Sequence, residues 1–192
     1  MEELFNDSTG QMVIIKNFIS KSESEHYFNQ LLDSISFEQQ DIHLFGKKIP
    51  IPRMESFHST NGSTYGYSGK RLTTNPFNQT LLTLKNRIEK SFDLSFNSVL
   101  VNLYRNEQDS NGWHADNEKG LGINPQIASL SLGQTRRFQL KNNLSQKRHV
   151  LYLTSGDLIL MRGSMQHHWK HQVPKEKYPC SPRLNLTFRY IY

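Results

Sequence analysis

The clearest pattern of polar and apolar residues lies near the end of the chain. Residues 183–191 read Arg-Leu-Asn-Leu-Thr-Phe-Arg-Tyr-Ile, an almost perfect alternation. Successive side chains of an extended strand point to opposite faces, so the two kinds of residue separate. The polar face comprises Arg183, Asn185, Thr187 and Arg189, and the apolar face comprises Leu184, Leu186, Phe188 and Tyr190. The pattern predicts a strand that is buried on one face and rich in hydrogen-bond donors on the other.

Two stretches in the first half of the chain have the spacing of amphipathic helices. Ser20 and Glu23 form a capping-box pair, which predicts a helix that continues to about Leu32. Asn75 and Pro76 have the residue types of an N-cap and a first helical position. Apolar residues spaced by three or four follow them: Phe77, Leu81, Leu84, Ile88 and Phe92. A second helix is therefore expected over 76–92.

Short apolar runs bounded by turn residues indicate strands. One run lies at 12–18, and the rest follow Ser98, at 99–104, 127–132, 137–140, 149–153, 158–161 and 183–191. We find no repeat, low-complexity tract or Pro/Gly-rich linker, so we expect one domain over 1–192. The predicted fold class is α+β and mainly β, with a sandwich or jelly-roll core over about 98–192 and the helices of 1–97 packed outside it.

Composition and charge narrow the class of protein. Hydrophobic residues make up 35% of the chain, which is modest but typical of a globular protein. The net charge of +6 and pI near 9.4 suit a polyanionic partner, and equally a solvated basic surface. Cys180 is the only cysteine, so no intrachain disulfide can form. We find no targeting or membrane segment, and we expect a monomer that is cytoplasmic (nucleoid) or nuclear, without membrane association and not secreted.

A His-Ala-Asp triplet offers candidate metal ligands. In an extended segment His114 and Asp116 share one face, so both can reach one ion. The candidates for a third ligand are His167, His168 and His171, and more weakly His149. Two histidines and one carboxylate form the ligand set of non-haem Fe(II) oxygenases, which leaves positions open for a bidentate co-substrate and oxygen. On its own, however, such a triplet is more often an accidental pair of surface residues.

The polar face of the last strand strengthens the metal hypothesis. Two guanidiniums with an amide and a hydroxyl between them suit a small carboxylate. An Fe(II) oxygenase that uses 2-oxoglutarate needs a basic clamp for the distal carboxylate of that molecule. The alternative is a solvated edge strand, which is plausible for Asn185 and Thr187 but less natural for Arg183 and Arg189.

Four segments in this order resemble the AlkB family of Fe(II)/2-oxoglutarate-dependent dioxygenases. They are Asn102-Leu103-Tyr104, His114-Ala115-Asp116, Trp169-Lys170-His171 and the run 183–189. The resemblance covers roughly residues 45–191 and implies a double-stranded β-helix, or jelly roll. It also implies that His114, Asp116 and His171 hold Fe(II), a choice of third ligand that spacing alone leaves open. The residues implied for 2-oxoglutarate are Asn102, Tyr104, Arg183, Asn185, Thr187 and Arg189, with Arg183 on the distal carboxylate and Arg189 near the metal beside Asp116.

The resemblance extends to the side that meets nucleic acid. Phe45-Gly46-Lys47 resembles the intercalating finger of the duplex-DNA-repairing branch, as does Pro52-Arg53, although the residues alone favour an inward-packed Phe and a solvated turn. The segment 64–69 resembles a nucleotide-recognition lid, in which Tyr67 stacks on a flipped base and Tyr65, next to Gly66, offers a hydroxyl. Asn117 stands where the duplex-repair relative has an acidic residue, and Glu118 remains close. The range of damaged bases is therefore left open.

The function implied by the resemblance is DNA repair by oxidative demethylation of N-alkylated bases, with release of formaldehyde. The implied lesions are 1-methyladenine and 3-methylcytosine, and the implied co-reactants are Fe(II), 2-oxoglutarate and O2. The expected partner is alkylated DNA, duplex or single-stranded, with RNA as a further candidate. Basic residues that would face phosphates, or else touch nothing, are Arg136, Arg137, Lys141, Lys147 and Arg148. The alternatives are an RNA demethylase or protein hydroxylase with the same iron chemistry, and a non-enzymatic basic DNA-binding domain.

Overall fold

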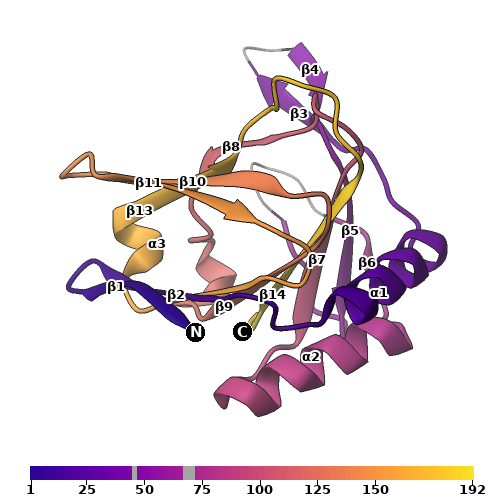
Figure 1. Cartoon of the computed structure of the whole chain (residues 1–192), viewed down its shortest axis with the longest axis horizontal. Coiled ribbons are helices and arrows are strands. Elements are labelled where there is room, and N and C mark those ends of the chain that lie inside the picture. Colours follow the sequence, from indigo (N-terminus) through magenta and orange to yellow (C-terminus); the bar gives the residue numbers. More distant parts are fainter. Residues whose placement is uncertain (45–46, 67–71) are drawn as a thin grey trace.

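Two facing β-sheets form the centre of the computed structural model, which describes residues 1–44, 47–66 and 72–192 (Figure 1). The larger sheet contains β1 (Glu2–Asp7), β2 (Gly10–Ile15), β5 (Met54–Ser59), β6 (Thr74–Asn75), β7 (Ser98–Tyr104), β9 (Ile127–Gly133), β12 (Leu158–Arg162) and β14 (Arg183–Arg189). Its strand order is β1-β2-β12-β9-β14-β7-β5-β6. The sheet therefore takes four strands from the segment before residue 98, of which the sequence pattern predicted only β2, as the run at 12–18.

The smaller sheet has the order β11-β10-β13-β8 and lies over the larger one. Its strands are β8 (Asn111–His114), β10 (Arg136–Asn142), β11 (Arg148–Leu153) and β13 (Trp169–Val173). A separate antiparallel pair, β3 (Asp41–Leu44) and β4 (Lys47–Pro50), stands at one end of the molecule (Figure 1). Two facing sheets with strands paired across long sequence separations make a jelly roll, which confirms the predicted fold class.

Two helices, α1 (Lys21–Ser34) and α2 (Gln79–Phe92), pack side by side on the outer face of the larger sheet (Figure 1). Their apolar faces join the apolar face of β14 in one hydrophobic cluster, which includes Leu31, Leu84, Ile88, Leu184 and Leu186. The short helices α3 (Met165–His168) and η1 (Lys119–Leu121) lie in connections. In the described part of the chain, no helix combines the length and the apolar character needed to cross a membrane.

The predicted start of the first helix is confirmed, and that of the second is wrong by three residues. Ser20 and Glu23 form both hydrogen bonds of a capping box. The second helix is capped by Asn78, whose Oδ1 accepts from the Leu81 backbone N–H at 2.9 Å. Asn75 is instead part of β6, and its Nδ2 donates to the Phe57 carbonyl of β5. Because the sheet uses Asn75, the cap moves to the next residue with a suitable side chain.

The sequence pattern missed β5, because polar residues occupy this buried strand. Glu55, Ser56, His58 and Ser59 are all buried. The Ser56 hydroxyl and His58 Nε2 are 3.1 Å apart, and His58 Nδ1 is 2.8 Å from the Pro76 carbonyl oxygen. Hydrogen bonds between these side chains offset the loss of water, so the strand needs no apolar alternation.

Gly156 lets the turn between β11 and β12 lie against the start of α1. Its φ is +88°, and a Cβ there would meet the Ile19 carbonyl oxygen and lie 2.8 Å from Ser24 Oγ. We expect Gly156→Ala to lower the free energy of unfolding by about 2–4 kcal/mol, measured by urea denaturation. Gly62→Ala is the matched control, because Gly62 also has a positive φ but no atom within 4 Å of the added Cβ. Equal losses in the two variants would contradict the steric argument.

Candidate metal and co-substrate site

Adjacent strands of the smaller sheet bring the candidate metal ligands together. β13 pairs with β8 so that His171 stands opposite His114, and their ring centroids are 4.2 Å apart. Asp116 follows β8 by two residues. Ligand atoms of His114, Asp116 and His171 all lie within 4.8 Å of one another. Of the histidines that spacing left open, the structure places His171 at this cluster, whereas His167 Nε2 lies 2.5 Å from the Ile123 carbonyl oxygen.

Arg189 fixes the carboxylate of this cluster. Its Nη2 donates to Asp116 Oδ2 at 2.7 Å, and the Asp116 backbone N–H donates to Gln166 Oε1 at 2.9 Å. Burial opposes ionisation, but the charge of Arg189 and its hydrogen bond hold the pKa of Asp116 well below its usual value. The prediction that Arg189 lies beside Asp116 is therefore confirmed by the geometry.

His171 has the protonation state that a metal requires. Burial, with repulsion from His114, lowers the pKa of His171 to about 3, although Asp116 opposes the shift. His171 Nδ1 is buried and has no hydrogen-bond partner among the described residues. His114 Nδ1 lies 2.7 Å from the Gly112 carbonyl, a contact that orients the ring. A buried carboxylate with two imidazoles matches the donor set for Fe(II), so the residues present fit the metal.

The polar face of β14 lines the interior and not the solvent. β14 lies between β9 and β7, and all seven of its residues are buried, so the solvated-edge alternative is wrong. Arg183 Nη2 donates to Ser131 Oγ at 2.9 Å, and Asn185 Nδ2 donates to Ser129 Oγ at 2.8 Å. The Thr187 hydroxyl donates to Asn185 Oδ1 at 3.3 Å. The strand ends at Arg189, two residues earlier than predicted.

Arg183 has the unfilled donors that a bound carboxylate would occupy. The residue is only 1% exposed, and its Nε and Nη1 are buried without a hydrogen-bond partner among the described residues. Burial lowers the pKa of Arg183 to about 10, so the guanidinium is charged at neutral pH. The guanidinium lies 5.3 Å from the centre of the Tyr104 ring. A buried, charged and partly unsatisfied guanidinium fits the distal carboxylate of 2-oxoglutarate.

One pocket of about 520 Å³ joins the candidate metal ligands to most of the predicted co-substrate residues. Its lining includes His114, Asp116, His171, Asn102, Tyr104, Asn185, Thr187 and Arg189. Arg183 does not line the pocket directly but lies against Tyr104, which does. The structure therefore places all nine predicted residues in or next to one cavity.

Several residues support this pocket in a role that was not predicted from the sequence. Arg53, buried at the pocket wall, donates from Nε to Asn102 Oδ1 at 2.8 Å. Ser129 and Ser131 accept hydrogen bonds from side chains of β14. Both alternate with apolar residues in β9, and this alternation could have placed them on the same face of their strand. Gln166 gives no such signal, because it lies in the short helix α3, far from Asp116 in sequence.

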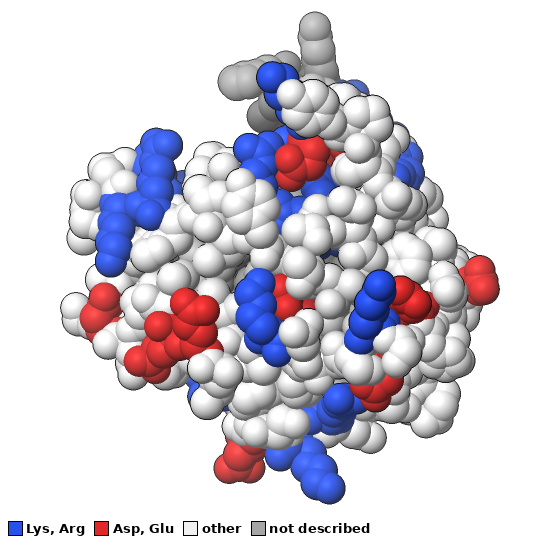
Figure 2. Space-filling view, in the orientation of Figure 1, with Lys and Arg blue, Asp and Glu red and all other residues white. Residues whose placement is uncertain are grey.

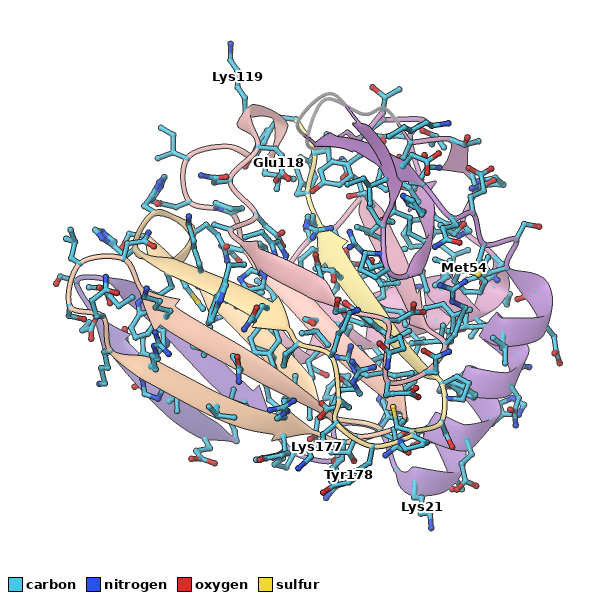
Figure 3. All side chains as sticks on the ribbon, turned by 90° about the horizontal axis from the view of Figure 1, so that it is seen from above. Lys21, Met54, Glu118, Lys119, Lys177 and Tyr178 are labelled. Carbon is cyan, nitrogen blue, oxygen red and sulfur yellow. The ribbon has the colours of Figure 1, made fainter. Side chains whose placement is uncertain are left out.

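Three of the predicted substrate residues also line the pocket: Tyr65, Asn117 and Glu118. The buried ring of Tyr65 stacks on Phe57, lies 5.3 Å from the Arg189 guanidinium carbon and is hydrogen-bonded to Glu118 through its hydroxyl. Burial, and then the charge of Asp116, raise the pKa of Glu118, and Oε2 of Glu118 is buried without a partner among the described residues. Figure 3 shows Glu118 beside Lys119, which points away from the molecule.

The structure places none of the remaining predicted substrate residues at the pocket. Phe45, Gly46 and Tyr67 lie outside the described residues, and Lys47 begins β4 with a side chain that is also not described. Gly66 is exposed and does not line the pocket. The intercalating finger and the stacking aromatic therefore stay predictions.

The expected basic surface needs one correction. Arg136 is 1% exposed, and its guanidinium donates to the carbonyls of Asn106, Asp109 and Pro174. It holds two loops together and does not face phosphates. Alternation in β10 is the reason, because Arg136 shares the inner face of the strand with Phe138 and Leu140.

Comparisons with known proteins agree with this geometry. The family model described as the 2OG-Fe(II) oxygenase superfamily matches residues 11–189. The chain is 36% identical over 192 residues to the alpha-ketoglutarate-dependent dioxygenase alkB homolog 3 of Bos taurus, covering 95% of this chain and 66% of that protein, just under two thirds of its length. It is 33% identical over 182 residues to the DNA oxidative demethylase ALKBH2 of Mus musculus, and the match covers 89% of this chain and 76% of that protein. The structure of OsALKBH1 has the same fold, with a TM-score of 0.68 and 20% sequence identity. The match covers 96% of this chain and 100% of that one.

Proposed function

Because the chain belongs to the AlkB family of 2OG-Fe(II) oxygenases, we propose that it removes methyl groups oxidatively from N-alkylated bases in DNA. The observation that carries the proposal is one pocket in which two histidines and a carboxylate lie beside the buried Arg189, with the buried Arg183 directly behind the pocket wall at Tyr104. The proposed lesions are 1-methyladenine and 3-methylcytosine. The naming of the relative ALKBH2 as a DNA oxidative demethylase supports a base in DNA as the substrate.

The residues of the pocket divide into two groups by chemistry. His114, Asp116 and His171 would hold Fe(II), and Arg183 with its polar neighbours on β14 would hold 2-oxoglutarate. When bound, iron and 2-oxoglutarate supply the oxidant that places one oxygen atom of O2 in a substrate C–H bond, with succinate and CO2 as co-products. An N-methyl group then becomes N-hydroxymethyl, whose N–C bond breaks to release formaldehyde. Arg189 keeps Asp116 ionised and in place throughout.

The substrate base would enter beside Tyr65, Asn117 and Glu118, which line the same pocket. A base inside a duplex must leave the stack to reach such a pocket, and this extrusion costs least where methylation already blocks pairing. 1-Methyladenine and 3-methylcytosine carry a positive charge, which the carboxylate of Glu118 would favour. Asn117 is neutral and exposed, so it adds no charge at this position.

The test is product analysis with a defined oligonucleotide. The protein is incubated with Fe(II), 2-oxoglutarate, ascorbate and DNA that contains one 1-methyladenine, and formaldehyde and restored adenine are measured by mass spectrometry. We expect both products in equal amounts, and neither product from His114→Ala. Parallel reactions use single-stranded DNA, duplex DNA and RNA. Turnover of RNA alone would reassign the substrate, and failure to form succinate with any methylated nucleic acid would overturn the proposal.

Replacing Glu118 with glutamine tests the electrostatic part of substrate recognition. The Glu118→Gln side chain keeps its size and can still accept from Tyr65, but it loses the charge. We expect kcat/KM for the cationic 1-methyladenine to fall by about tenfold, equivalent to about 1.4 kcal/mol. The neutral lesion 3-methylthymine is the matched substrate control and should change little. Equal losses with both lesions would show that Glu118 acts through packing alone.

A further inference from the structure

The outer face of the smaller sheet carries a groove of about 400 Å³ that the proposed function does not use. Its lining residues are Trp113, Gln139, Lys141, Asn143, Gln146, Arg148, Lys170 and Gln172. In Figure 3 this face is turned toward the viewer, and no described helix lies over it. The inner face of the same sheet carries His114 and His171. We refer to this feature as the outer-sheet groove.

A row of three cations crosses the groove. In the strand register Lys141 of β10 stands directly opposite Arg148 of β11 on one side and Lys170 of β13 on the other. Adjacent strands are 4.7–4.9 Å apart, so the row spans about 10 Å. Like charges directly opposite each other on one sheet face are destabilising. In the native sheet this arrangement therefore costs stability unless an anion lies across it.

Protein carboxylates do not neutralise this row. Among the described residues, none of the three cations forms an ion pair, and no Asp or Glu lines the groove. Another cation on the same face of β10, Arg137, is paired with Glu176 at 3.0 Å. Figure 2 shows Lys and Arg side chains over the β10–β11 end, with acidic side chains below them over β1. The uncompensated charge is thus local to the groove.

An exposed tryptophan connects the groove to the metal site. Trp113 is 40% exposed and lines both the outer-sheet groove and the pocket of His114. The floor of the groove is formed by amides, and Gln172 Nε2 donates to Gln139 Oε1 at 2.6 Å. An indole next to a row of cations is the combination that binds unpaired bases and their backbone. A duplex offers no free base face to the indole.

We propose that the outer-sheet groove binds the sugar–phosphate backbone of a single-stranded polynucleotide, with an unpaired base on Trp113. The strand would run from the metal pocket over Trp113 and across the row of Lys170, Lys141 and Arg148. This inference rests on the proposed function, because it takes the polynucleotide to be the substrate of that pocket. It adds that the nucleotides flanking the damaged base are held unpaired.

Binding is measured without iron or 2-oxoglutarate, so that the result does not depend on catalysis. The probe is an unmodified thymidine oligonucleotide, and the readout is tryptophan fluorescence. The chain has two tryptophans, and Trp169 is only 2% exposed, so quenching reports on Trp113. We expect quenching by the single strand, no quenching in Trp113→Phe, and none by a blunt duplex. Duplex binding at equal affinity would overturn the proposal.

The double variant Lys141→Gln/Lys170→Gln tests the cation row. We expect affinity for the single strand to fall roughly tenfold, and the slope of log K against log salt to become shallower by about 1.4, since each single-strand phosphate contact contributes about 0.7. Lys21→Gln/Lys90→Gln removes the same charge from exposed positions on α1 and α2 and should leave the slope unchanged. The melting temperature of the first variant should stay equal or rise, because repulsion within the row is relieved.

The outcomes separate the groove from the proposed function. An unchanged salt slope in Lys141→Gln/Lys170→Gln overturns the groove, whether or not the protein releases formaldehyde. Groove binding without formaldehyde release overturns the proposed function instead. A uridine oligonucleotide of the same length is the second arm, and tighter binding of it through the same residues supports the groove and assigns it to RNA.

Discussion

Asp116→Asn is expected to abolish demethylation by removing the metal. The variant keeps the size of the side chain and the backbone bond to Gln166, but it offers the ion a neutral amide in place of a carboxylate. We expect the affinity for Mn(II), a probe of the Fe(II) site, to fall by at least about 100-fold, and turnover by about 1,000-fold or more. Metal binding is measured by calorimetric titration and turnover by formaldehyde release.

The choice of substitution matters because Arg189 is buried against Asp116. Both variants remove the counter-charge of Arg189, but Asp116→Ala would also remove its hydrogen-bond acceptor, and loss of one partner of a buried pair typically costs about 3–5 kcal/mol. A failure to fold would then imitate a failure to bind metal. Asn117→Ala is the neighbouring control, since Asn117 is exposed and should not alter Mn(II) affinity. Mn(II) affinity in Asp116→Asn equal to that of the unmodified protein would contradict the assignment.

The contrast between β14 and β5 shows how far the sequence predicts this fold. In β14 strict alternation predicted both the strand and the shared face of Arg183 and Arg189, and both are present. β5 is also buried, but its polar residues are satisfied by each other and by a loop carbonyl, so no hydropathy pattern marks it. Hydrogen bonds between side chains depend on the tertiary structure, so the alternation of polar and apolar residues does not predict them.

The third metal ligand shows a similar limit. His167, His168 and His171 are close in sequence, and spacing could not choose among them. In the structure α3 ends at His168 and β13 begins at Trp169, so alternation turns Trp169, His171 and Val173 inward. The choice depends on where a four-residue helix ends. Arg136 is the converse case. Its alternation with Phe138 indicates a buried side chain, whereas its charge alone favoured an exposed side chain that faces phosphates.

We expect Arg183→Met to stabilise the co-substrate-free protein and to weaken the binding of 2-oxoglutarate. Without a bound anion, the Nε and Nη1 atoms of Arg183 are buried and unpartnered among the described residues, a costly arrangement. Methionine has a similar length and no buried charge, and such replacements are often neutral or stabilising by about 1–4 kcal/mol. We therefore expect the melting temperature of the co-substrate-free protein to stay equal or rise.

The affinity for 2-oxoglutarate should change in the opposite direction. Loss of charge-assisted hydrogen bonds to a carboxylate, worth about 3 kcal/mol together, corresponds to an affinity roughly 100-fold weaker. Calorimetric titration of 2-oxoglutarate into the Mn(II)-loaded protein measures this loss, and Mn(II) affinity itself should not change. Ser131→Ala is the control, because it removes one contact of Arg183 but leaves the charge. A variant both less stable and unchanged in 2-oxoglutarate affinity would make Arg183 a structural residue that acts through Ser131 and Tyr104, and it would contradict the assignment of its unpartnered donors to the ligand carboxylate.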